Sequence, residues 1–464
     1  MTENQLTANH SNSAGTAAQG GASPQSEGTL PRAIGMWGST AIVVGTIIGS
    51  GIFLVPHDMA QQVGSARMLF LVWIVGALLS LAGALSLAEL GAAMPEAGGI
   101  YIYLREAYGK LFAFLYGWGM LLVINSGSVA TLAVAFGIYS STFIPLSPIQ
   151  QKFVAGSVIA VLTVVNYLGV RKAAAVQTIF TIAKLSGLAI IFGYAFFSTG
   201  YTPVISTHVS PTPVTTFSSF WVALISALWA YEGWHMLSYN AGEVRNPDRV
   251  LPRSYFLGTL TVVAVYLIAN LAYLRVIPFN ALSEDSYQRV AASTMQVLAG
   301  PRGAIFVSAL ILCSIFGALN GNVLGGPRAY FAMARDGVFF ASAGRIHPIY
   351  KTPDLAILIQ GVWSIVLASS GSFKQLYTSV IFTGWIFYGA AAIAVIVMRL
   401  RRPDMKRPYH VWGYPFLPIV FSMAALAIVI NTLLNSPKES LVGVSLVLAG
   451  IPIYFFWTRL RRAA

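Results

Sequence analysis

Two glycine-containing segments interrupt long apolar stretches of the sequence. Gly45, Gly49 and Gly51 lie in the first stretch, and in the second Gly233 follows the carboxylate Glu232 between aromatic residues. Glycine inside a helix costs about 1 kcal/mol relative to alanine, so both segments favour local unwinding. An unwound helix exposes backbone N–H groups that attract anions and carbonyl groups that attract cations. Together, the two segments are suited to a ligand that carries both charges.

Each segment also has an interpretation without a ligand. Gly45 and Gly49 have the small-xxx-small spacing of helix contact faces, so close packing explains the first segment as well as unwinding does. Glu232 could be a protonated carboxyl that packs against another helix. A charge at such depth costs roughly 2.5–3.5 kcal/mol and normally faces a cavity or a partner, which favours a functional interpretation of Glu232.

Lys184 is a further ionisable residue inside an apolar stretch. At about 3.6 residues per turn it lies some two turns from the start of its segment, which is borderline for a lysine that snorkels to the interface. The sequence has no metal-ligand spacing, no P-loop and no GxGxxG after a strand. It therefore predicts no metal, no cofactor and no catalytic residue, and its one cysteine, Cys313, can form no internal disulfide.

The elements that carry these residues are expected to span a membrane. Hydrophobic residues make up 56% of the 464 and charged residues 9%, against about 45–50% and about 25% in soluble domains. A spanning helix needs about 20 mostly apolar residues. That window predicts an all-α protein with about twelve transmembrane helices, at 33–56, 68–94, 111–142, 153–170, 174–198, 217–241, 255–276, 303–332, 354–370, 376–399, 413–434 and 440–458.

The net charge of +13 is distributed as an orientation signal. Lys and Arg gather in alternate loops, above all around residues 399–407 and 459–462, so the positive-inside rule predicts that both termini are cytoplasmic. The charge therefore indicates a multi-pass protein of the plasma membrane in contact with lipid and no nucleic-acid partner. Residues 1–32 are polar and lack an apolar block, which predicts a disordered cytoplasmic tail.

The interrupted stretches are the first and the sixth of the twelve, and four sequence blocks agree with this arrangement. On these blocks the chain resembles the amino acid–polyamine–organocation superfamily, and within it the L-amino-acid-transporter-like branch of neutral amino-acid exchangers. The blocks are GTIIGSGIF (45–53), AELG (88–91) with MPEAGG (94–99), WAYEGW (229–234) with GEVRNP (242–247), and FGALNG (316–321) with MARDG (333–337).

The resemblance implies a LeuT-like fold with substrate bound midway across the membrane. The core, residues 33–399, would contain inverted repeats at about 33–198 and 217–399 with helices 1 and 6 discontinuous, and residues 400–464 would add helices 11 and 12 and a basic C-terminus. The first break would bind the substrate carboxylate and both breaks its ammonium, with Trp229 as an aromatic gate. The implied substrate-binding residues are Ile47, Gly49, Ser50, Gly51, Ile52, Trp229, Ala230, Tyr231, Glu232 and Gly233.

The resemblance also gives Lys184 a role. It implies that the lysine lies against the unwound first helix, where sodium-coupled relatives bind the ion, with Ser314 as a candidate polar neighbour. The expected protein is a sodium-independent, alternating-access transporter of neutral L-amino acids that works as an exchanger. Proton-coupled uptake of an amino acid, or carriage of a polyamine, is the alternative; a channel, a membrane enzyme or a receptor is remote. The resemblance implies that animal members of this branch join a heavy subunit through a cysteine in the loop after helix 3. That loop, near residues 140–152, holds no cysteine here, so no disulfide-linked heavy subunit is expected.

Charged and aromatic residues near the predicted helix ends have two interpretations. Glu89, Glu243 and Arg335 could form an inner gate network, and ordinary interfacial charges explain them equally well. Four aromatic residues are expected in the interfacial belts of the membrane, namely Tyr101, Tyr103, Trp118 and Trp412.

Overall fold

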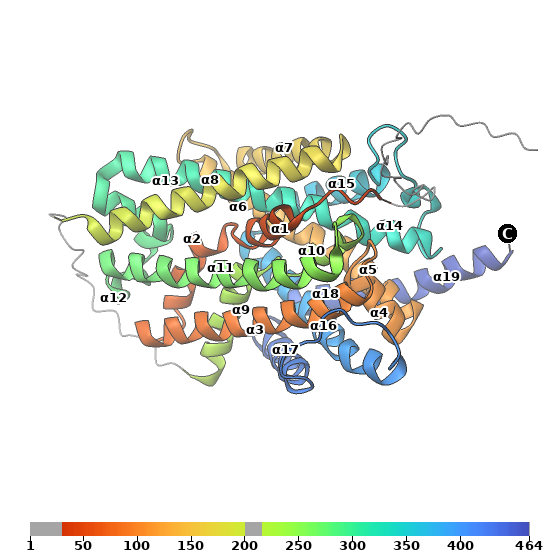
Figure 1. Ribbon diagram of the computed structural model, residues 1–464. Coiled ribbons are helices and arrows are strands. Elements are labelled where there is room, and N and C mark those ends of the chain that lie inside the picture. The colour runs from red at the N-terminus through yellow and green to blue at the C-terminus, as the bar shows by residue number, and fades with distance from the viewer. Residues whose placement is uncertain (1–29, 200–215, 464) are drawn as a thin grey trace, which may run out of the picture.

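The computed structural model describes residues 30–199 and 216–463, and within these ranges it is built from helices (Figure 1). Three 3-10 turns, η2 (Ala241–Glu243), η3 (Asp285–Tyr287) and η4 (Ala341–Gly344), and one π turn, η1 (Met120–Ile124), accompany the α-helices. The helices are α1 (Met36–Ile47), α2 (Gly51–Ala60), α3 (Ala66–Ala93), α4 (Ile100–Tyr108), α5 (Lys110–Gly119), α6 (Asn125–Ser140), α7 (Pro148–Tyr167), α8 (Val170–Phe197), α9 (Phe217–Tyr231), α10 (Met236–Tyr239), α11 (Pro247–Val276), α12 (Phe279–Leu282), α13 (Val290–Gly325), α14 (Pro327–Arg335), α15 (Asp354–Ser370), α16 (Phe373–Arg401), α17 (Phe416–Asn435), α18 (Pro437–Leu448) and α19 (Gly450–Ala463).

The helices agree with the predicted all-α, polytopic architecture. Ten helical stretches in the described part of the chain are long and apolar enough to cross a membrane, and the shorter apolar helices α9 and α15 lie at the two remaining predicted positions. The eighth span differs in detail. It begins earlier than predicted, at Val290, bends at Gly300 with φ +66° before Pro301, and ends at Gly325, after which α14 is a separate helix. The division into inverted repeats remains a prediction.

Both predicted helix interruptions are present. Between α1 and α2, Ile48 leaves the helical region with φ −73° and ψ 91°. After α9, Glu232 is extended and Gly233 has φ +115°, a conformation that favours glycine. Figure 1 shows α1 with α2, and α9 with α10, in the middle of the bundle. There α1 packs on α8, α11 and α13, and α2 packs on α9.

The bundle has two distinct ends (Figure 1). The α4 end carries α4, α14 and α19, and the α12 end carries α12. The folded body begins before the predicted tail boundary at residue 32, because Leu30 is buried and Ile34 exchanges backbone hydrogen bonds with Glu243 and Arg245. The rest of the predicted tail, 1–29, lies outside the described residues.

A fully buried ion pair holds α14 against the segment that follows α10. Arg328 Nε donates to Glu243 Oε1 at 2.8 Å, and both side chains have no exposed surface. The Arg328 guanidinium also donates to the Leu324 carbonyl. Removal of one partner from such a pair leaves a buried charge without compensation, which costs about 3–5 kcal/mol, whereas replacing both by apolar residues is often neutral.

We therefore expect Arg328→Met to lower the thermal unfolding temperature of the purified protein markedly, because Glu243 stays buried and loses its partner. The double variant Arg328→Met/Glu243→Leu should recover most of the loss. Thermal unfolding in one detergent, followed by fluorescence, compares the three proteins. Equal stability of the single variant and the parent would show that the pair does not stabilise the fold.

Candidate functional site

A small cavity lies where the two interrupted helices meet. Its volume is about 20 Å³, which is room for about one water molecule, so the two breaks are nearly closed on each other in this conformation. Segments from both breaks form its wall together with α6 and α13. The lining residues are Thr46, Ile47, Gly49, Ser50, Gly51, Ser128, Leu132, Trp229, Glu232 and Asn322.

Six of the ten residues expected to bind substrate line this cavity: Ile47, Gly49, Ser50, Gly51, Trp229 and Glu232. The other four lie beside it. Ala230 is so close to Gly51 that a Cβ atom on Gly51 would lie 2.5 Å from the Ala230 Cα, and Gly233 approaches Thr46 in the same way. Because Gly51 and Gly233 have no side chain, the two breaks can come into direct contact. Ile52 is fully buried outside the cavity wall.

Tyr231 faces away from the cavity wall. Its ring packs against Trp73 at 5.6 Å and Tyr266 at 5.0 Å between centroids. Four further residues of the wall were not predicted, and they come from the last turn of α1, before the first break, and from α6 and α13. Polar side chains inside predicted spans were the only available signal, and only for Thr46, Ser128 and Asn322; Leu132 had none.

The breaks present backbone groups of both signs. The first N–H groups of α2, at Gly51 and Ile52, have no partner inside the helix, and the positive end of the helix dipole lies there. The carbonyl groups at the breaks are partly occupied. Tyr266 on α11 donates its hydroxyl toward both Ile47 O, at 3.1 Å, and Ala230 O, at 2.8 Å. No local sequence pattern predicts this contact.

Lys184 reaches the break in the first helix from α8. Its Nζ donates to the carbonyl groups of Gly45 at 2.9 Å, Ile48 at 2.5 Å and Ser314 at 2.9 Å. The side chain has no exposed surface, so the snorkelling interpretation is wrong. The Ser314 hydroxyl lies on the same break, where it donates to Ile48 O at 3.1 Å and is 3.3 Å from Gly49 O.

Three polar atoms of the cavity wall have no hydrogen-bond partner among the described residues: Ser50 Oγ, Trp229 Nε1 and Glu232 Oε2. Buried polar atoms are nearly always hydrogen-bonded, so such a group in a cavity points to a ligand or water. The second oxygen of Glu232 is held from the other side. Its Oε1 accepts from the Tyr388 hydroxyl at 2.8 Å and lies 3.6 Å from His235 Nδ1.

Aromatic rings cover the cavity toward the α12 end. Trp229 stacks on Tyr377 with centroids 5.7 Å apart and an angle of 23° between the planes. Phe373 meets both rings edge-on, at 6.2 Å from Trp229 and 5.4 Å from Tyr377. Trp229 thus lies between the cavity and the Tyr377 ring, and its role as an aromatic gate remains a prediction.

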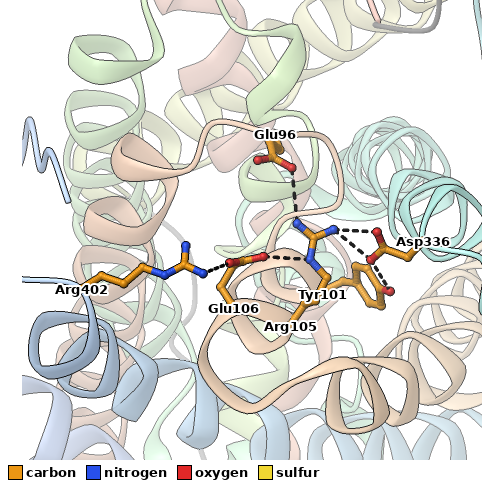
Figure 2. Close-up of polar contacts among 6 residues, drawn as sticks. All are labelled: Glu96, Tyr101, Arg105, Glu106, Asp336 and Arg402. Atoms are coloured by element: carbon orange, nitrogen blue, oxygen red, sulfur yellow. Dashed lines mark hydrogen bonds and ion pairs between the residues drawn. The ribbon is translucent and has the colours of Figure 1, made fainter. Parts of the chain in front are cut away.

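A network of charges closes the α4 end (Figure 2). Arg105 donates to both Asp336 oxygens at 2.8 and 2.9 Å and to Glu106 at 3.0 Å, and Tyr101 donates to Asp336 at 2.8 Å. Burial opposes the charge of Arg105, but its bonds to Asp336 and Glu106 outweigh this and raise its pKa. Burial and the neighbouring Asp336 likewise raise the pKa of Tyr101. Arg105 therefore stays charged and Tyr101 neutral at neutral pH, and their bonds to Asp336 tie α4 to the end of α14.

The residues proposed for an inner gate are not brought together. Glu89 binds Arg399 at 2.7 Å and 2.8 Å, Glu243 binds Arg328, and Arg335 is exposed and lies over the Phe331 ring. A single network of Glu89, Glu243 and Arg335 is therefore wrong. The network that forms uses Asp336, which belongs to the quoted MARDG block, and Arg105, six residues after the MPEAGG block.

The belt interpretation is wrong for two of the four aromatic residues. Tyr101 and Tyr103 are fully buried within the protein. Trp118 is half-buried and donates its indole N–H to the Leu446 carbonyl at 3.0 Å. Trp412 is 59% exposed, as an interfacial residue would be.

Apolar helices that surround a cavity between two interrupted helices define a multi-pass membrane transporter. The sequence matches the model of the amino acid permease family over residues 34–457. The chain belongs to this family.

Relatives over nearly the whole length support the assignment to amino-acid transport. The chain is 32% identical to the serine/threonine exchanger SteT of Bacillus subtilis over 428 residues, which are 92% of this chain and 97% of the relative. It is 31% identical to the b(0,+)-type amino acid transporter 1 of Mus musculus (92% and 88%) and to the cystine/glutamate transporter of Homo sapiens (92% and 85%). The family and these relatives are transporters and not enzymes.

The contact between Gly51 and Ala230 gives a test of the site. We expect Gly51→Leu to abolish amino-acid transport in proteoliposomes while the protein still inserts and purifies, because the new side chain separates the two breaks. Gly193→Leu is the matched control, since a Cβ atom at Gly193 meets no atom within 4 Å. Parental transport by Gly51→Leu would contradict the assignment of this cavity as the transport site.

Proposed function

We propose that the protein exchanges small neutral L-amino acids across the membrane by alternating access, independently of sodium. The observation that carries the proposal is the Lys184 ammonium, which is bonded to three backbone carbonyl groups at the first break. The resemblance implies that sodium-coupled relatives bind their ion at this place. A fixed ammonium there supplies the positive charge that a sodium ion would supply, so the break needs no cation from solution.

The cavity favours a substrate without net charge on its side chain. Among its lining residues Glu232 is the only ionisable one, and no Lys or Arg is present to neutralise an acidic substrate side chain. The name of the Bacillus subtilis relative, a serine/threonine exchanger, agrees with a small polar substrate, and we take L-serine as the probe.

The substrate would bind by its zwitterionic group. The carboxylate would meet the N–H groups at the start of α2, where the helix dipole is positive. The ammonium would share the carbonyl groups of Ile47 and Ala230 with the Tyr266 hydroxyl, since each carbonyl oxygen has two lone pairs. Neither step makes or breaks a covalent bond.

We also propose that the protein lies in the plasma membrane with its α4 end in the cytoplasm. Arg399, Arg401 and Arg402 lie at this end, and positive residues concentrate in cytoplasmic loops. In this orientation the α12 end is outside. A disulfide-linked heavy subunit is not part of the proposal, because the sequence has a single cysteine, Cys313, which belongs to α13.

Exchange in proteoliposomes tests the proposal. Vesicles loaded with unlabelled L-serine should take up labelled L-serine many times faster than empty vesicles. Replacing sodium by potassium should change the uptake rate less than about twofold, because no sodium ion takes part in binding; a sodium ion coupled to binding by about 1.4 kcal/mol would change it tenfold. Protein-free vesicles are the control. Accumulation that requires a sodium gradient would refute the role of Lys184, and equal uptake by empty vesicles would refute exchange.

Proton-coupled uptake is the second candidate, and Glu232 favours it. The carboxyl is buried in the cavity wall, accepts from Tyr388 and has His235 as its nearest basic group. A polyamine is less well supported, because a polycation needs several acids and the cavity wall has this one.

Glu232→Gln separates the two candidates. If exchange is correct, the amide keeps an oxygen for the Tyr388 hydroxyl and L-serine exchange should change by less than about threefold, since a neutral hydrogen bond contributes about 1 kcal/mol. If proton coupling is correct, the parent should accumulate L-serine on an imposed pH gradient and the variant should not. Uptake driven by pH jumps in empty vesicles measures the difference.

A further inference from the structure

A second cavity lies at the α12 end of the bundle. It is lined by residues of α2, α9, α16 and α17 and of the links that follow α2 and α17, and its volume is about 270 Å³. Polar side chains dominate its wall. Those that matter here are Asp58, Ser226, Lys374, Tyr377, Thr378 and Asn435.

This outer cavity and the central cavity are separated by aromatic rings. Tyr377 lines the outer cavity, Trp229 lines the central one, and their rings stack at 5.7 Å. Ser226, three residues before Trp229 on α9, also lines the outer cavity, and residues at this spacing share one helix face. Only the stacked rings of Trp229 and Tyr377 therefore separate a molecule in the outer cavity from the central cavity.

The outer cavity carries one negative and one positive side chain on different helices. Asp58 belongs to α2 and Lys374 to α16, and their charges interact. Within the described part of the chain no ion pair within 4 Å includes either of them. The charges facing Asp58 come from Lys374 and from its neighbour His57.

We propose that this outer cavity is a second binding site for zwitterionic amino acids, occupied before Trp229 and Tyr377 give access to the central cavity. Asp58 binds the α-ammonium group and Lys374 the α-carboxylate. Ser226, Thr378 and Asn435 supply neutral hydrogen-bonding groups between them. The site holds the groups that all amino acids share, so it sets the rate of capture and leaves the choice of side chain to the central cavity.

The proposal rests on the proposed function, and a sided measurement separates the two. Exchange of labelled L-serine is measured in right-side-out and in inside-out membrane vesicles. We expect Asp58→Asn and Lys374→Gln each to raise the KM for L-serine at the α12 end by about three- to tenfold, the range for loss of one charge-assisted hydrogen bond at a partly exposed site. The KM at the α4 end and the maximal exchange rate should not change.

Two controls make the outcome specific. Lys438→Gln removes another positive charge from the N-terminal turn of α18 and should leave both KM values unchanged. Asp58→Glu and Lys374→Arg keep the charges and should retain most of the parental KM, which distinguishes loss of binding from misfolding.

Three results would overturn the outer site. Parental KM values in both neutralised variants would show that the two charges do not bind substrate. An equal rise in KM at both ends, or a fall in the maximal rate alone, would place these residues in the closing movement. If the parent exchanges no amino acid at all, the proposed function fails first, which is a different result from normal exchange with unchanged KM.

Discussion

The hydrogen bonds from the Lys184 ammonium to three carbonyl groups hold the centre of the molecule together. A helix interrupted inside an apolar bundle leaves carbonyl groups without partners, and burying them without hydrogen bonds is costly. Lys184 on α8 satisfies two of them, at Gly45 and Ile48, and binds Ser314 of α13 with its third hydrogen. The lysine in turn keeps a buried charge only because these carbonyl dipoles surround it. The interrupted helix and the buried cation therefore stabilise each other.

This arrangement places the polar groups of the protein in layers along the bundle. The α4 end is closed by ionised pairs, with Arg105, Asp336 and Glu106 at its surface and Arg328 with Glu243 beneath. The middle relies on backbone dipoles and a few neutral side chains. Toward the α12 end, stacked rings separate the middle from the outer cavity that holds Asp58 and Lys374. Ion pairs are specific in geometry, whereas aromatic stacking tolerates sliding, so the two ends resist movement in different ways.

The elements could be predicted from the sequence much better than the contacts between them. The twelve spans follow from local hydropathy, and both breaks follow from Gly49, Gly51 and Gly233, whose backbone freedom is a property of the residue itself. Short helices such as α4, nine residues long, escape a window set to membrane thickness. Tyr388 and Glu232 are 156 positions apart, and Tyr266 and Ile47 are 219 apart. Nothing in either local sequence records that these pairs meet, so the partners of Glu232 and the Tyr266 contact were missed.

The Tyr266 hydroxyl has a consequence for the protein without its cargo. One hydroxyl hydrogen is offered to two carbonyl oxygens on separate half-helices, Ile47 O and Ala230 O. Whichever oxygen holds the hydrogen, the other keeps a lone pair directed at the same place, so rotation about one C–O bond changes the acceptor without moving the backbone. In the proposed binding mode, an arriving ammonium group would take the oxygen that the hydroxyl releases. The number of hydrogen bonds at these two carbonyl groups would then change little between the unloaded and the loaded protein, which would lower the energy difference between the two states.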